Sequence, residues 1–113
     1  MMRSKYNARK VRLDGYTFDS MMEADHYCEL KLLEKAKLIR DLKVHPAYIL
    51  QEPFTYEGKW EKAITYEADF SYMEGGRQVV EDVKGMRTDV YKIKRKLFLK
   101  RYGSELIFKE VHR

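Results

Sequence analysis

A predicted β-hairpin brings two acidic residues and a lysine together. Apolar and polar side chains alternate over residues 64–72, the pattern of a half-buried strand, and a second predicted strand at 78–84 follows a Gly-Gly turn. Counting back from that turn places Asp69 opposite Asp82, with Cβ atoms roughly 5 Å apart. Lys84 lies two residues beyond Asp82 and therefore shares its face of the sheet. We expect two carboxylates and one ammonium group at the same place.

This arrangement favours a divalent cation. Like charges that face each other destabilise a sheet, and a cation between them removes the conflict. Mg²⁺ takes oxygen ligands, commonly one or two carboxylates plus waters, and a neighbouring lysine can hold or polarise an attacking water. A second interpretation stays open. The same register places Glu67 opposite Lys84, so these two could form an ion pair while Asp69 and Asp82 are solvated on an exposed face.

Composition predicts a single globular domain. The chain has 113 residues, of which 44% are hydrophobic and 36% charged. No apolar run approaches the length of a membrane span, and the N-terminus lacks the apolar core of a signal peptide. The single cysteine, Cys28, leaves no internal disulfide and favours a reducing cytoplasm. No glycine-rich phosphate-binding motif is present, so we expect no nucleotide cofactor. Because no apolar run is long enough to span a membrane, we also expect no membrane partner.

The positive charge is concentrated in two segments. Residues 1–12 hold five Lys or Arg and no acid, and residues 84–102 hold eight with one acid, within a net charge of +5. Such clustering suits a polyanion such as nucleic acid. A solvated helix and a disordered basic tail would give the same pattern. We predict a basic N-terminal arm at 1–10 and one domain at 11–113.

The first predicted helix runs from about Ser20 to Ile39. Ser20 and Glu23 match the S-x-x-E capping box, so Glu23 either caps the helix or points into the protein. Because apolar residues cover two sides, we expect a largely buried helix. The two predicted stripes are Met21, Ala24, Cys28, Leu32 and Ile39, and Tyr27, Leu30 and Leu33.

The second predicted helix begins after Thr88 as N-cap, carries Asp89 in its first turn and ends at Gly103. Lys94 is placed near the carboxylates. The predicted buried stripe is Val90, Ile93 and Leu97, and the predicted solvent-facing residues are Lys92, Arg95 and Lys96.

Shorter strands complete the prediction. Residues 11–18 form a small hairpin around Asp-Gly, residues 42–50 form a strand interrupted by Pro46, and a short hairpin follows around residues 57–59. A last strand spans 105–111. The three histidines are scattered and indicate no histidine metal site, and His45 is interpreted as a strand or turn residue. Helices packed on a mixed central sheet, an α/β fold, are the expected architecture.

The residues carry a resemblance. The order Glu23, Asp69, Asp82-x-Lys84 and then a basic helix resembles the PD-(D/E)XK nuclease superfamily. The segments F-D-S-M-M-E-A, A-D-F, V-E-D-V-K-G and Y-K-I-K-R-K further resemble its small phage-encoded members over roughly residues 5–111. The superfamily includes RecU-like Holliday junction resolvases and the transposon endonuclease subunit TnsA. Ala68 stands where the pattern has proline. The resemblance implies a restriction-endonuclease-like αβββαβ core, with a mixed sheet flanked by two main helices, here preceded by a small hairpin.

The resemblance also implies an activity, namely Mg²⁺-dependent DNA hydrolysis with Mn²⁺ as a substitute. Asp69, Asp82, the Val83 carbonyl and Glu23 would bind the metal, and Lys84 would orient the nucleophilic water. The expected substrate is branched DNA such as Holliday junctions or flaps, and the expected products carry a 5′-phosphate and a 3′-hydroxyl. The expected DNA-backbone contacts are Lys5, Arg9, Lys10, Arg87, Lys92, Lys94, Arg95 and Lys96.

Other functions fit the same sequence. Cutting both strands would require a homodimer, since one unit cuts one strand per site. A catalytically inactive nuclease fold that binds DNA, or an accessory protein of phage replication or packaging, is the main alternative. A purely structural or regulatory protein is a third interpretation, and it predicts neither metal binding nor salt-sensitive DNA binding.

Overall fold

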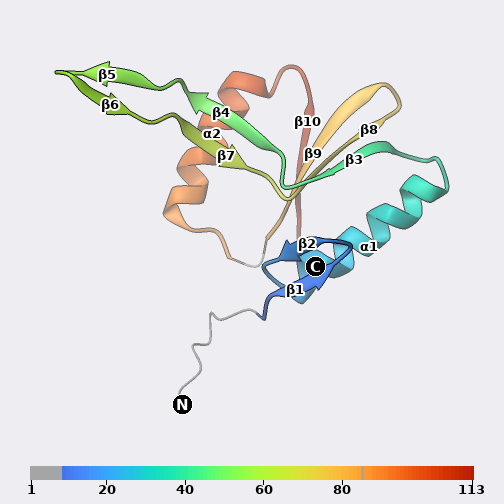
Figure 1. Cartoon of the computed structure of the whole chain (residues 1–113). Helices are drawn as coiled ribbons and strands as arrows, with labels where there is room; N and C mark the ends of the chain where they lie inside the picture. The colour runs from blue at the N-terminus through green and yellow to red at the C-terminus, as the bar shows by residue number, and fades with distance from the viewer. Residues whose placement is uncertain (1–8, 85) are drawn as a thin grey trace, which may run out of the picture.

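The computed structural model describes residues 9–84 and 86–113, which form a mixed α/β fold (Figure 1). The predicted arm at residues 1–10, with Lys5, lies mostly outside the described residues, as does Gly85. In chain order the elements are β1 (Val11–Leu13), β2 (Tyr16–Phe18), α1 (Met21–Lys35), β3 (Arg40–Val44), β4 (Ala47–Gln51), β5 (Phe54–Tyr56), β6 (Lys59–Glu61), β7 (Ile64–Glu67), β8 (Phe70–Glu74), β9 (Arg77–Val83), α2 (Asp89–Tyr102) and β10 (Ile107–Val111).

A four-stranded mixed sheet forms the centre of the molecule. Its strand order is β10-β9-β8-β3, with β10 parallel to β9 and the other pairs antiparallel. The predicted turn between β8 and β9 is confirmed, since Gly75 and Gly76 both have positive φ, at 58° and 82°. Phe70 pairs with Glu81, which is the predicted register. That register brings Asp69 level with Asp82 just beyond the last paired residues.

Two neighbouring strands break at the same level. The register that pairs Val44 with Phe70 continues on the other side of the break, where Ala47 pairs with Glu67. At the break, the amide of His45 donates to the carbonyl of Asp69 at 2.9 Å. The predicted interruption at Pro46 is confirmed, since β3 ends at Val44 and β4 begins at Ala47. Proline has no amide hydrogen to donate to a neighbouring strand. The prediction of one unbroken strand over residues 64–72 is wrong.

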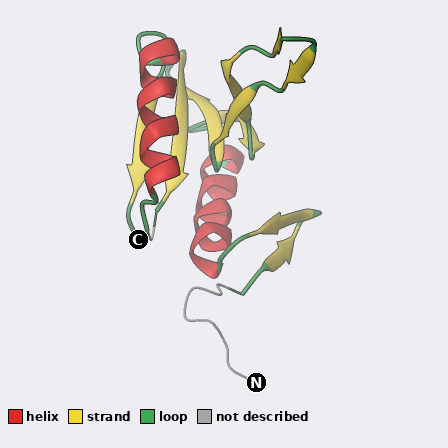
Figure 2. Cartoon of the chain, turned by 90° about the vertical axis from the view of Figure 1, so that its left-hand side faces the viewer, coloured by secondary structure: helices red, strands yellow, loops and turns green. Residues whose placement is uncertain are grey.

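The break changes which face the side chains occupy. Tyr66 and Ala68 lie in the core beneath α2, whereas Phe70 and Tyr72 lie in the core beneath α1. Simple alternation had placed all of them on one face. The two helices cover opposite faces of the sheet (Figure 2). The α1-side core consists of Phe18, Ala24, Tyr27, Leu30, Ile39, Phe70, Tyr72, Val79 and Val83, and the α2-side core of Tyr66, Ala68, Val80, Tyr91, Phe98 and Leu106.

Helix α1 begins as predicted but ends earlier. The Ser20 hydroxyl accepts from the amide of Glu23 at 3.1 Å, which confirms the cap, and the helix ends at Lys35 rather than Ile39. Only one face is buried, so the prediction of a largely buried helix is wrong. Met21, Leu32 and Cys28 are exposed, because α1 packs on the sheet and the β1–β2 hairpin on one side alone. The buried residues are Glu23, Ala24, His26, Tyr27 and Leu30.

Helix α2 has the predicted bounds, but the prediction of its buried face is wrong. The Thr88 hydroxyl accepts from the amide of Tyr91 at 3.1 Å, and Gly103 follows the last turn. The helix buries Tyr91 and Phe98, which pack against Tyr66. Large aromatic side chains outcompete smaller aliphatic ones for the core. The predicted buried stripe is instead exposed, with Val90 at 62%, Ile93 at 61% and Leu97 at 43%.

The β5–β6 hairpin extends away from the body of the molecule (Figure 1). It confirms the short hairpin predicted around residues 57–59, and the β1–β2 hairpin confirms the one predicted within residues 11–18. No helix in residues 9–84 or 86–113 is long and apolar enough to cross a membrane.

Candidate active site

A hollow of about 310 Å³ lies where the two strand pairs break and where both helices begin. Asp69, Asp82 and Lys84 all line it, as the hairpin register predicts. Asp69 faces this hollow and its neighbour Phe70 belongs to the opposite core, as the alternation of side chains along a strand requires. The lining residues are Asp19, His45, Tyr66, Glu67, Asp69, Asp82, Lys84, Thr88, Val90, Tyr91 and Lys94.

Asp82 is a buried carboxylate, only 2% exposed. The Tyr66 hydroxyl donates a hydrogen bond to its Oδ2 atom. Its Oδ1 atom lies 2.6 Å from Lys84 Nζ, an ion pair, but receives no hydrogen bond of normal geometry from the described residues. The alternative interpretation of a solvated, exposed acidic face is therefore wrong for Asp82. Oδ1 has capacity for another electropositive partner.

Lys84 is held against the sheet and the second helix. Its amide donates to the carbonyl of Val111 at 2.9 Å, and Nζ lies 3.8 Å from the centroid of the Tyr91 ring. The described residues show no ion pair between Lys84 and Glu67, because Nζ points to Asp82 instead. The ammonium group is thus fixed beside the carboxylates.

Two acidic residues, Asp82 and Glu23, lie close to Asp69. Burial, followed by the charges of Asp82 and Glu23, raises the pKa of Asp69 to about 8. The amide of Val83 donates to its Oδ2 atom at 2.6 Å and opposes that rise. The role proposed for the Val83 carbonyl as a ligand stays a prediction, since the contact described for Val83 uses its amide. A cation would relieve the repulsion at Asp69 directly.

Glu23 points into the protein and meets a histidine that the sequence analysis had set aside. It is 5% exposed, and its Oε1 atom lies 2.7 Å from His45 Nε2. Burial raises the pKa of Glu23, and the contact with His45 partly opposes the rise. Ligand atoms of Glu23, His45 and Asp69 lie within 4.8 Å of one another. The strand register places His45 opposite Asp69 and Pro46 opposite Ala68. This pairing would have indicated from the sequence that His45 lies near the carboxylates.

Two of the predicted DNA contacts lie at this hollow, and three others are exposed elsewhere. Lys94 lines it, and Lys10 lies 3.9 Å from Asp19, another lining residue. Lys92 and Lys96 are exposed on α2 as predicted, and Arg9 is exposed near the N-terminal end of the described chain. These side chains are free to approach a polyanion.

The two arginines predicted to hold DNA contact an acidic residue of the fold. Arg87 Nε and Arg95 Nε each lie 3.5 Å from Glu110 Oε2. Arg95 also lies over the Phe108 ring and is half-buried, so the prediction that it projects into solvent is wrong. Arg95 lies on the same side of α2 as the buried residues Tyr91 and Phe98. The prediction had assigned that side of the helix to the solvent.

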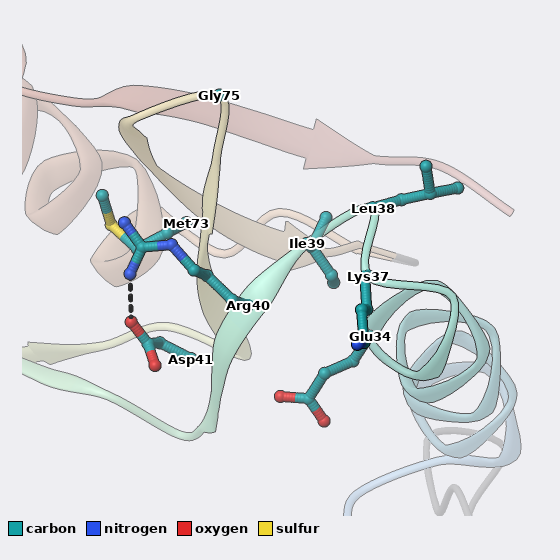
Figure 3. A pocket seen from close by; sticks show the side chains of 8 residues that line it. All are labelled: Glu34, Lys37, Leu38, Ile39, Arg40, Asp41, Met73 and Gly75. Atoms are coloured by element: carbon teal, nitrogen blue, oxygen red, sulfur yellow. Dashed lines mark hydrogen bonds and ion pairs between the residues drawn. The ribbon is translucent and has the colours of Figure 1, made fainter.

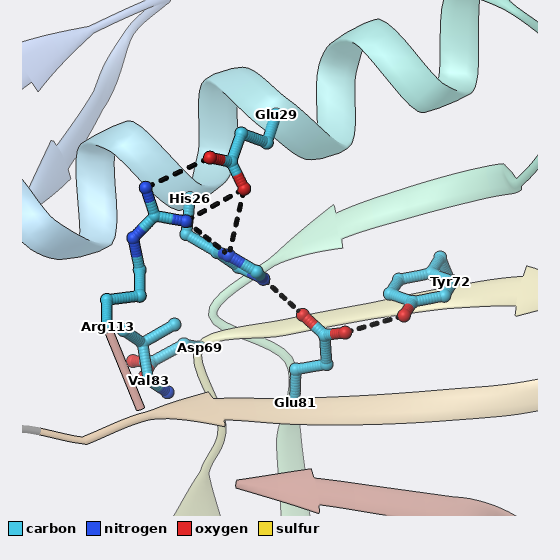
Figure 4. Close-up of polar contacts among 7 residues, drawn as sticks. All are labelled: His26, Glu29, Asp69, Tyr72, Glu81, Val83 and Arg113. Atoms are coloured by element: carbon cyan, nitrogen blue, oxygen red, sulfur yellow. Dashed lines mark hydrogen bonds and ion pairs between the residues drawn. The ribbon is translucent and has the colours of Figure 1, made fainter. Parts of the chain in front are cut away.

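A second buried polar cluster lies on the α1 face of the sheet (Figure 4). His26 Nε2 lies 2.5 Å from Glu81 Oε1, and the Tyr72 hydroxyl donates to Glu81 Oε2 at 2.6 Å. Arg113 lies 3.2 Å from His26 Nδ1 and forms an ion pair with Glu29. Burial alone would raise the pKa of Glu81, but the bonds from His26 and Tyr72 outweigh it and leave that pKa lowered. The sequence analysis did not identify this network.

A larger hollow of about 400 Å³ lies between the end of α1 and the β8–β9 turn (Figure 3). It contains Glu34, Lys37, Arg40 and Asp41, and Arg40 donates to Asp41 at 2.8 Å. Both members of that pair are exposed. We therefore do not choose the candidate site by size, because none of the charged residues that line this larger hollow is fully buried.

The donor set of the smaller hollow fits a hard divalent cation. Asp69 and Asp82 line the hollow, and Glu23 and His45 have ligand atoms within 4.8 Å of one on Asp69. The three carboxylates offer the oxygen ligands that Mg²⁺ and Mn²⁺ prefer, and His45 adds an imidazole nitrogen. Oδ1 of buried Asp82 has only the Lys84 ion pair and no hydrogen bond of normal geometry, and burial with the charges of Asp82 and Glu23 raises the pKa of Asp69. Both observations are compatible with a bound cation. These residues would hold the ion.

Fold and site together define a mixed α/β protein with a buried carboxylate–lysine cluster at a break in its sheet. The chain belongs to the family DUF1064, described as "Protein of unknown function (DUF1064)", whose profile matches residues 3–111. Comparisons with curated proteins and with solved structures found no match.

Proposed function

We propose that this protein is a Mg²⁺-dependent DNA endonuclease with a restriction-endonuclease-like core. The main support is the convergence of Asp69, Asp82 and Lys84 on one hollow, with Glu23 close to Asp69. The two helices and the strands of the four-stranded sheet follow one another as α1, β3, β8, β9, α2 and β10, with β4 to β7 inserted between β3 and β8. This order is compatible with the αβββαβ core of the PD-(D/E)XK superfamily that the sequence resembles. Mn²⁺ would substitute for Mg²⁺ at such oxygen ligands.

The side chains have distinct roles in this proposal. Asp69 and Asp82 hold the ion, aided by Glu23 and the Val83 carbonyl. When bound, Mg²⁺ lowers the pKa of a coordinated water and stabilises negative charge on the phosphate and the leaving oxygen. Lys84 Nζ orients the attacking water by hydrogen bonding and offsets charge on the non-bridging phosphate oxygens. Tyr66 keeps Asp82 in place through its hydroxyl.

The DNA backbone approaches from the side of α2 and the N-terminal segment. Lys94 lies at the hollow, with Lys92 and Lys96 exposed nearby on the same helix. Such contacts supply affinity that falls with salt and little sequence preference. We extend the proposal to branched DNA in the cytoplasm of a phage-infected bacterium.

The test is a cleavage assay with labelled duplex, single strand, flap and four-way junction in Mg²⁺ or Mn²⁺. Asp82→Asn and Lys84→Ala should both lose metal-dependent cutting. Asp41→Asn and Lys43→Ala serve as matched controls, because both residues are exposed and lie outside this hollow. They should cut as the wild-type protein does.

Two results would overturn the proposal. One is the absence of cutting on every substrate despite salt-sensitive DNA binding, which would leave an inactive DNA-binding or accessory protein. The other is cutting that survives Asp82→Asn, which would assign the activity to a contaminant or to another site.

A further inference from the structure

The β5–β6 hairpin has no packing partner among the described residues. The two strands form a separate two-stranded sheet, and every residue in them is exposed (Figure 1). An isolated two-stranded hairpin is at best marginally stable in water. We define residues 52–61, which contain this hairpin, as the aromatic arm. An additional contact would stabilise it.

The aromatic arm exposes three large rings. Phe54, Tyr56 and Trp60 are 44%, 62% and 67% exposed. Thr55 pairs with Trp60, so Phe54 and Tyr56 lie on one face of the hairpin and Trp60 on the other. Aromatic residues grouped in this way are typical of protein–protein interfaces.

A second exposed apolar surface lies on α2. Val90, Ile93 and Leu97 follow one another at helical spacing and form what we define as the α2 stripe. Lys94 lies on one side of this stripe, and Lys96 lies on the other. A partner that fits it combines apolar side chains with acidic ones at its rim.

We propose that the protein forms a two-fold symmetric dimer in which the aromatic arm of each copy packs on the α2 stripe of the other. The aromatic arm has three glutamates and one lysine, whereas α2 has six basic residues and one acid. Their charges are complementary. Helix-to-helix pairing would oppose the same basic residues, and nucleic acid would meet the negative charge of the arm.

The aromatic arm begins beside the C-terminal end of α2, so the two surfaces belong to neighbouring parts of one molecule. Glu52, at the base of the aromatic arm, forms an ion pair with Arg101 near the end of α2 at 3.0 Å. The Tyr102 hydroxyl donates to the carbonyl of Ile49 at 2.8 Å. One rotation can therefore bring both arms onto both helices.

The available area suits a weak dimer. The exposed parts of Phe54 and Tyr56, which share one face, amount to roughly 200–250 Å² per arm. Two arms and the two helix surfaces that they cover together reach roughly 900 Å², the range of weak or transient interfaces. This dimer does not depend on nuclease activity.

Trp60 is the only tryptophan in the chain, and its place in the aromatic arm makes its emission a report on the surroundings of that arm. Its emission should shift to shorter wavelength as protein concentration rises from about 1 to 200 µM, together with a monomer-to-dimer change in sedimentation velocity. The paired change Ile93→Lys with Leu97→Lys should abolish both effects. Leu32→Lys is the control, since Leu32 is a 66% exposed aliphatic residue that lies on α1. It should change neither measurement.

Three results would overturn the dimer. The first is a monomer at every concentration. The second is a dimer that persists in the α2 stripe variant. The third is Trp60 emission that responds to single-stranded or four-way-junction DNA but not to protein concentration, which would assign the aromatic arm to nucleic acid.

Cross-linking tests the reciprocal contact itself. In a Cys28→Ser background, a protein carrying Tyr56→Cys is mixed with one carrying Leu97→Cys and oxidised. The mixture should form more disulfide-linked dimer than either protein alone. Equal yields in all three samples would contradict the proposed pairing of arm and stripe.

Discussion

Glu81 and Asp82 are adjacent buried carboxylates with opposite surroundings. Glu81 faces α1, where His26 and Tyr72 donate hydrogen bonds to both of its oxygens and its pKa is lowered. Asp82 faces α2, where Oδ1 has only an ion pair of poor hydrogen-bond geometry and neighbouring Asp69 has a raised pKa. A buried carboxylate whose oxygens all accept hydrogen bonds is typical of a structural role. A buried carboxylate oxygen without such a bond is more typical of a functional site.

The largest expected difference is in activity. Asp82→Asn should lower metal-dependent cleavage by at least about a thousandfold, because it removes the charge of a proposed metal ligand. Glu81→Gln should retain cleavage within about tenfold, since Glu81 faces the other core. Single-turnover assays on the preferred DNA measure both rates. Similar losses of cleavage in the two variants would contradict the different roles inferred for Asp82 and Glu81.

The next effect is on stability. His26→Ala leaves Glu81 buried without its histidine partner, which should cost about 3 kcal/mol of unfolding free energy. Urea denaturation followed by circular dichroism measures the change. His112→Ala is the control, because His112 is exposed. A loss below about 1 kcal/mol for His26→Ala would show that this pair adds little.

A smaller effect of opposite sign is expected at Asp69. Its raised pKa means that the protonated form stabilises the fold at low pH and that this stability is lost as pH rises toward about 8. Asp69→Asn should therefore stabilise the metal-free protein by about 1–2 kcal/mol at about pH 8.5 and by much less at about pH 5.

Urea melts in EDTA at the two pH values measure this difference, with exposed Asp41→Asn as the control. Mg²⁺ should stabilise the wild-type protein more than the Asp69→Asn variant. A variant that is less stable than wild type at both pH values would contradict the inferred repulsion.

The smallest effect concerns the basic residues. Changing exposed Lys92 and Lys96 to Gln should weaken DNA binding about threefold to tenfold and reduce the salt slope by about 2. Arg95→Gln should leave that slope nearly unchanged, because Arg95 already contacts Glu110. Fluorescence anisotropy at several KCl concentrations checks both. Equal changes in slope would mean that Arg95 also contacts phosphate.

Much of the site followed from local sequence. The Gly75-Gly76 turn determines the hairpin register, and that register aligns Asp69 with Asp82. Ser20 and Thr88 accept from the amides three residues on and start both helices. These features depend on neighbours in the chain, so residue type and spacing are sufficient to predict them.

The tertiary structure alone decided which faces are buried and which histidine joins the carboxylates. His45 meets Glu23 only because the strands on both sides of Pro46 and Asp69 break at the same level. The aromatic residues of α2 displace Ile93 and Leu97 from the core because their partners come from distant strands. Periodicity describes which side chains share a face, but packing between distant segments selects the face that is buried.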